Sequence, residues 1–106
     1  MLIVPLKDFK QGWFVGSFEP RAFYSKDVEV CCRIHPKGEF WPRHYHKIGT
    51  EINVLLHGSM LINNVEIKEG EVFIIYPGEW AEPTYMTDCE IVIIKVPSIP
   101  GDKYES

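Results

Sequence analysis

Short apolar segments separated by turn residues dominate this chain and restrict it to a fold made of strands. Residues 28–35 show the pattern most clearly, because apolar and polar side chains alternate there with a period of two. Further predicted strands cover residues 51–57, 59–62, 65–67, 72–76 and 90–96. Residues 72–76 are apolar on both faces, which predicts a central strand. No window of helical length carries a helical stripe, so we predict an all-β sandwich or barrel.

Turn chemistry and chain length define the organisation. Asn63 and Asn64 lie between two apolar segments and predict a two-residue hairpin turn, because Asn tolerates positive φ. The 106 residues contain no repeat and no boundary, so we expect a single domain over residues 1–106. Two prolines and a glycine prevent residues 97–106 from continuing a central strand. We expect this tail to lie over the surface or to reach a partner subunit.

Composition argues against several classes of partner. The net charge is −4, and 11 Lys and Arg are scattered among 15 Asp and Glu without a basic stripe. We therefore expect no nucleic-acid partner and no membrane partner. The apolar runs are too short for a spanning helix, and the start has no basic leader. Three cysteines, two of them adjacent, form no disulfide framework, which favours a reducing, cytoplasmic compartment.

A candidate metal site lies in the middle of the chain. His44 and His46 are two residues apart, so on an extended strand both imidazoles point to one face. Glu51 opens the next predicted strand after a short reversal and can return beside them. Two imidazoles and a carboxylate suit a divalent Fe, Mn, Ni, Cu or Zn ion. The alternative is an exposed polar strand pair without a metal.

The spacing around these residues resembles a known motif. Residues 38–58 read G-x5-H-x-H-x4-E-x6-G, which resembles the first motif of the cupin superfamily at every fixed position. The resemblance implies a small antiparallel jelly-roll barrel, with a metal held inside by His44, His46 and Glu51. That fold agrees with the strand pattern found independently.

The second motif of that superfamily is incomplete in this chain. In residues 70–85, Ala81 stands where the resemblance implies a fourth, histidine ligand, and Tyr85 stands at the asparagine position. The vacant position could be filled by water or substrate, or by Glu79, which lies two residues before Ala81. Otherwise the metal is weak or absent. His57 shares the predicted face of Glu51 and is a further pocket candidate, as is Tyr85, although a solvated strand end is the plainer interpretation of His57.

Three functions remain open at this level. The first is a barrel that binds a polar small molecule, such as a carbohydrate or another oxygen-rich metabolite, beside a three-ligand metal site. The second is a metal-dependent enzyme of the sugar isomerase, epimerase or dioxygenase type, in which Arg43 and Lys47 could attract an anionic substrate. The third is a degenerate barrel without metal. We also expect a homodimer, because short barrels expose edge strands and the apolar residues 1–6 could add to a neighbour's sheet.

Overall fold

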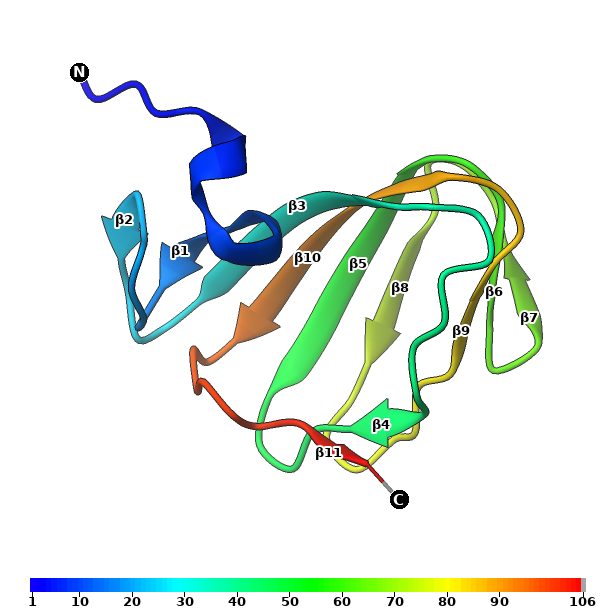
Figure 1. The fold of residues 1–106 in the computed structure, drawn as a ribbon. Coiled ribbons are helices and arrows are strands. Elements are labelled where there is room, and N and C mark those ends of the chain that lie inside the picture. The colour runs from blue at the N-terminus through cyan, green and yellow to red at the C-terminus, as the bar shows by residue number, and fades with distance from the viewer. Residues whose placement is uncertain (106) are drawn as a thin grey trace.

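The computed structural model describes residues 1–105, and nearly all of its regular secondary structure is strand (Figure 1). Two short 3-10 turns, Leu6–Asp8 and Lys10–Gly12, precede the first strand. The strands are β1 (Trp13–Gly16), β2 (Phe23–Tyr24), β3 (Glu29–His35), β4 (His44–Tyr45), β5 (Thr50–His57), β6 (Met60–Ile62), β7 (Val65–Ile67), β8 (Val72–Ile75), β9 (Pro83–Tyr85), β10 (Cys89–Val96) and β11 (Tyr104–Glu105). No helix in residues 1–105 is long and apolar enough to cross a membrane.

The strands form two facing layers. One is a six-stranded sheet in the order β2-β1-β3-β10-β5-β8. The other is the β7-β6-β9 sheet, which a bridge between His44 and Ala81 extends to β4 and its partner β11. All named pairs are antiparallel except β1 with β2. Figure 1 shows β4, β6 and β9 facing the larger sheet, with β11 beside β4. The prediction of an all-β antiparallel jelly roll is confirmed.

Local turn chemistry also matches the sequence. Asn63 and Asn64 adopt φ of 51° and 64° and connect β6 to β7 with Ile62 opposite Val65. Gly58, which ends the first motif, has φ of 105°. A Cβ at this position would lie 2.4 Å from the Asp88 carbonyl oxygen, so only glycine fits there.

The position of residues 72–76 in the sheet differs from the prediction. Residues 72–76 were predicted as a central strand, and this is wrong because β8 is an edge of the six-stranded sheet. Its inner residues, Phe73 and Ile75, pack on the core, while Val72 and Ile74 are 57% and 41% exposed. Apolar residues therefore occupy both faces of β8 although only one face is covered in the single chain.

The tail returns to the open end of the barrel. It leaves β10, passes the loop between β4 and β5, and ends as β11 beside β4 (Figure 1). Two polar residues of this tail, Ser98 and Asp102, are buried. The Ser98 hydroxyl donates a hydrogen bond to Glu29 Oε2 at 2.8 Å, which fastens the tail to the inner face of β3.

Candidate metal centre

A cavity of about 190 Å³ lies between the two layers. It contains His44, His46 and Glu51 together with apolar side chains of the core. A cavity of this volume is large enough for a small molecule. The three residues singled out from the first motif thus line one interior space.

Two strands and the loop between them bring these side chains together. His44 opens β4, His46 follows it in the loop, and Glu51 lies on β5 after the reversal. One ligand atom from each residue lies within 4.8 Å of the others. His46 Nε2 and Glu51 Oε2 are 2.8 Å apart. His46 is only 2% exposed, so the cluster faces the barrel interior and not the solvent.

Backbone oxygens orient both imidazoles. His44 Nδ1 donates to the Pro42 carbonyl oxygen at 3.1 Å, and His46 Nδ1 donates to the carbonyl oxygen of Asp102. A carbonyl can only accept, so each Nδ1 carries a hydrogen, and Nε2 is the atom that carries the lone pair when the ring is neutral. Metal-binding histidines are commonly oriented in this way, by a hydrogen bond from the ring nitrogen that does not face the metal.

The chemistry of this donor set fits a divalent ion. His46 Nε2 lies at hydrogen-bond distance from a carboxylate oxygen, and these two atoms need either a proton, which makes His46 an imidazolium, or a metal ion between them. Two imidazoles and one carboxylate leave coordination positions open for other ligands. His44, His46 and Glu51 could therefore hold a metal ion.

Electrostatics keep the ligands in the protonation states that binding needs. Burial alone would raise the pKa of Glu51, but the hydrogen bond with His46 and the charge on Lys95 outweigh it and lower this pKa. Burial lowers the pKa of His44 below its usual 6.5 and outweighs the opposing hydrogen bond to Pro42. An ionised carboxylate and a neutral imidazole therefore meet in the cavity at neutral pH.

Ala81, at the position where the resemblance implies a fourth ligand, offers only a methyl group. Ala81 pairs directly with His44 through two backbone hydrogen bonds of 2.7 and 3.0 Å, and it lines the cavity. Glu79 does not line this cavity, because its carboxylate accepts the Tyr76 N–H in an exposed turn. His57 also lies outside the cavity, with a side chain 74% exposed and 3.7 Å from Glu69. Tyr85 is buried and does line the cavity.

Asp102 in the tail is a positioning residue that the sequence analysis missed. Its carboxylate accepts the backbone N–H groups of Lys47, Ile48 and Gly49 at 2.8 to 3.1 Å. Its own carbonyl oxygen holds His46. Burial would raise the pKa of Asp102, but the three backbone donors outweigh it and lower this pKa. The tail thus holds in place the loop between His46 and β5, the strand that carries Glu51.

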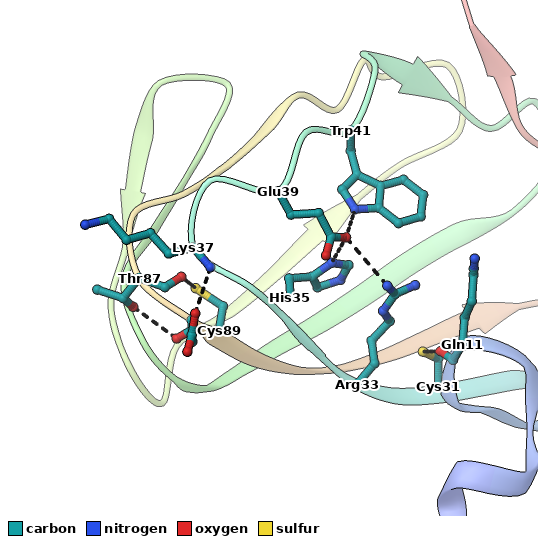
Figure 2. A network of polar contacts seen from close by, with 10 residues as sticks. Gln11, Cys31, Arg33, His35, Lys37, Glu39, Trp41, Thr87 and Cys89 are labelled. Atoms are coloured by element: carbon teal, nitrogen blue, oxygen red, sulfur yellow. Dashed lines mark hydrogen bonds and ion pairs between the residues drawn. The ribbon is translucent and has the colours of Figure 1, made fainter.

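A second polar network, drawn in Figure 2, contributes Arg33, His35 and Trp41 to the lining of the same cavity. The Glu39 carboxylate accepts from His35 Nδ1 at 3.0 Å and from the Trp41 indole N–H, and Arg33 lies 3.5 Å away. The His35 ring stacks on Tyr85 with a centroid separation of 4.4 Å. Burial lowers the pKa of His35 although Glu39 opposes the shift.

Strand parity could have revealed this second network. His35 and Arg33 lie on the face of β3 that also carries Cys31, and Cys31 and His35 are buried, whereas Ile34 on the opposite face is 60% exposed. The inner face of this strand is therefore the more polar one. The same parity applies to β5, where Glu51 and Asn53 point inward and Ile52 points outward.

Known proteins match this chain in structure but not in sequence. No protein-family profile matches the chain, and no curated protein matches it. A double-stranded β-helix protein of Klebsiella pneumoniae superposes with a TM-score of 0.68 at 18% identity. The match covers 77% of this chain and 72% of the Klebsiella protein. An RmlC-like cupin protein of Desulfovibrio desulfuricans gives 0.61 at 20% identity, covering 71% and 76%.

A larger protein is also similar. The DMSP lyase DddQ of Ruegeria pomeroyi superposes with a TM-score of 0.72 at 17% identity, covering 89% of this chain. This chain spans only 49% of that lyase. Identities this low carry the fold and not the chemistry. The structural matches, together with the strand order and the interior cavity, show that this chain has the cupin, or double-stranded β-helix, fold.

Proposed function

We propose that this protein binds a polar small molecule inside its barrel, beside a divalent transition-metal ion held by His44, His46 and Glu51. The observation that carries the proposal is the orientation of the two imidazoles. Both give Nδ1–H to a backbone oxygen and keep Nε2 for the cavity that Glu51 shares. A bound ion would act there as a Lewis acid toward an oxygen ligand.

The missing fourth side chain supports a ligand-binding role. Ala81 leaves room beside His44 instead of a fourth donor. In metalloenzymes, three protein ligands with an open position are typical of sites that accept water or substrate, whereas structural sites are closed. The proposed small molecule would supply oxygen to that open position, which suits a carbohydrate or another oxygen-rich metabolite.

Metal titration of purified protein tests this proposal with matched controls. Isothermal titration calorimetry with zinc should give one site per chain, which is lost in His46→Gln and in Glu51→Gln. The chain offers controls of the same chemistry outside the cavity, His57→Gln and Glu79→Gln, which should bind zinc as the parent does. Equal loss of binding in the control and the ligand variants would contradict ligation by this cluster.

An enzyme is the second candidate, and a metal-free structural barrel is the third. The enzyme is favoured by the open coordination position, and one protein of the same fold is described as a lyase. Turnover of any substrate that disappears in Glu51→Gln, while the circular dichroism spectrum is unchanged, would establish the enzyme. If the parent protein binds no divalent ion, the structural barrel is the remaining candidate.

We also propose that two copies pair through the outer face of the six-stranded sheet. Cross-strand neighbours on this face form a continuous apolar row: Ile94, Ile52 and Ile74, followed by Val92, Val54 and Val72. Leu56 extends the row and is 40% exposed. An apolar patch of this kind on a sheet marks an interaction surface, and a flat one is complementary to itself. Sedimentation equilibrium tests the pairing.

A further inference from the structure

The cavity carries a charge opposite to that of the whole chain. Three cationic side chains line it, Arg33 from β3, Lys95 from β10 and Lys103 from the tail, against one carboxylate, that of Glu51. The chain as a whole has a net charge of −4. An acidic protein that gathers cations around an interior cavity has an interior suited to an anion.

Two of these cations lie against the same indole. The Arg33 guanidinium is 5.3 Å and the Lys103 ammonium 4.5 Å from the centroid of the Trp41 ring. Burial lowers the pKa of Lys103, and the charges on Lys95 and Arg33 lower it further. The three positive charges therefore act on one another through the same space.

The acidic residues nearby leave these charges incompletely compensated. Within residues 1–105, neither Lys95 nor Lys103 has an ion-pair partner. Arg33 faces Glu39, but that carboxylate already accepts two other hydrogen bonds. Glu51 is directed at His46, where a metal ion would use its charge. Arg43 and Lys47, which flank the ligands in sequence, instead pack on Trp80 and Tyr104 and do not line the cavity.

A buried amide provides an independent pointer to a ligand. Asn53 follows Glu51 on the inner face of β5, lines the cavity and is 2% exposed. Its Nδ2 has no hydrogen-bond partner, and it is the only buried side-chain nitrogen or oxygen in residues 1–105 without one. A buried donor left unpaired costs about 1–3 kcal/mol, so such a group is expected to meet an acceptor.

We propose that the cavity binds a small carboxylic acid as its anion, with the carboxylate held among Arg33, Lys95 and Lys103 and an oxygen accepting from Asn53. This deepens the proposed small-molecule function and rests on it. Within the described part of the chain, Lys95 and Lys103 are cations without an ion-pair partner, and the Asn53 amide is a hydrogen-bond donor without an acceptor. These groups match a negatively charged ligand that accepts hydrogen bonds. The remaining lining includes Phe73, Ile75 and Ile93, which suits a carbon skeleton and distinguishes an organic acid from an inorganic anion.

Three probes of equal size separate charge from shape. Lactate, lactamide and glycerol have the same number of non-hydrogen atoms and fit the volume of about 190 Å³. They present a carboxylate, a neutral amide and a neutral polyol respectively. Two-dimensional NMR titrations of the full chain, with and without zinc, give the dissociation constant of each. Lactate should bind at least about tenfold more tightly than lactamide or glycerol, as expected for hydrogen bonds to a charged group.

Variants then assign the binding to these residues. Arg33→Gln and Lys103→Gln should each weaken lactate binding about tenfold or more, while Arg43→Gln, which removes the same charge outside the cavity, should not. The Lys103 variant lies in the tail and keeps the test usable if the Arg33 variant fails to fold. Asn53→Leu should weaken lactate binding without lowering the free energy of unfolding, because it removes an unpaired donor. If Asn53 is only structural, Asn53→Leu should lower the free energy of unfolding and leave lactate binding unchanged.

The outcomes distinguish the two proposals. Lactate binding that persists in zinc-free protein and falls in the Lys103 and Asn53 variants supports the anion site even if zinc does not bind, in which case only the metal proposal fails. Equal affinity for lactate, lactamide and glycerol would overturn the anion site. So would the absence of lactate-dependent shifts, or lactate affinity unchanged by the Lys103 and Asn53 substitutions.

Discussion

Replacing Asp102 by asparagine tests how the tail supports the metal loop. Asp102 Oδ1 accepts the Lys47 N–H at 3.0 Å, and Oδ2 accepts those of Ile48 and Gly49 at 3.1 and 2.8 Å. In Asp102→Asn, the amide oxygen can take the place of Oδ2 and keep two of these bonds. The amide nitrogen then faces the Lys47 N–H, so a donor meets a donor and one bond to a charged acceptor is lost.

The expected loss of stability follows from these three bonds. A bond to a charged group contributes about 1.5–3 kcal/mol, and the two retained bonds weaken when their acceptor becomes neutral. We expect the free energy of unfolding to fall by about 3 kcal/mol and Tm to fall by about 10–15 °C. The loop carries Glu51 and His46 at its two ends, so zinc affinity should also fall about tenfold.

Thermal and urea unfolding, followed by circular dichroism at one protein concentration, measure the change. Asp27→Asn is the matched control, because Asp27 is exposed and its carboxylate makes no hydrogen bond within residues 1–105. The folded pKa of Asp102 is lowered from its usual 3.8, so its stabilising effect is complete above that value and disappears as the pH falls through the folded pKa. The parent and the variant should therefore converge at low pH. If the two variants differ by less than about 0.5 kcal/mol at pH 7, the inferred role of Asp102 is wrong.

Three further predictions follow from the site and the outer face. Zinc affinity should be constant near neutral pH and fall below about pH 6, because the imidazoles must be neutral and burial lowers the pKa of His44; an affinity that stays constant from about pH 8 to pH 5 in calorimetric titrations would contradict histidine ligation. Ala81→His, which restores a donor opposite His44, should raise zinc affinity, and an affinity equal to or below that of the parent would show that the vacancy lies elsewhere. Ile74→Lys should convert the proposed dimer to a monomer in sedimentation experiments, whereas Val65→Lys, at an apolar and more exposed site on β7, should not.

Much of the local structure could be predicted from the sequence. The hairpin at Asn63 and Asn64 forms because few other residues tolerate positive φ at both positions. Glu51 lies beside the two histidines because a strand, a reversal and a strand of these lengths return it there, and the spacing of the motif records those lengths. These features depend on contacts between residues that are near one another in the chain, so pattern and turn chemistry are sufficient.

The remaining features depend on which face of each strand is inside, and only the tertiary structure decides this. Apolar residues lie on both faces of β8 and on the outer face of β3, so strand parity groups Arg33 with His35 but hydrophobicity does not tell that their face is the inner one. The structure brings Asp102 to the His46 loop across 56 positions of sequence, and it brings Lys103 to the cavity of Arg33 and Asn53. No local pattern encodes such contacts, because they arise only when the two sheets close and the tail crosses the open end of the barrel.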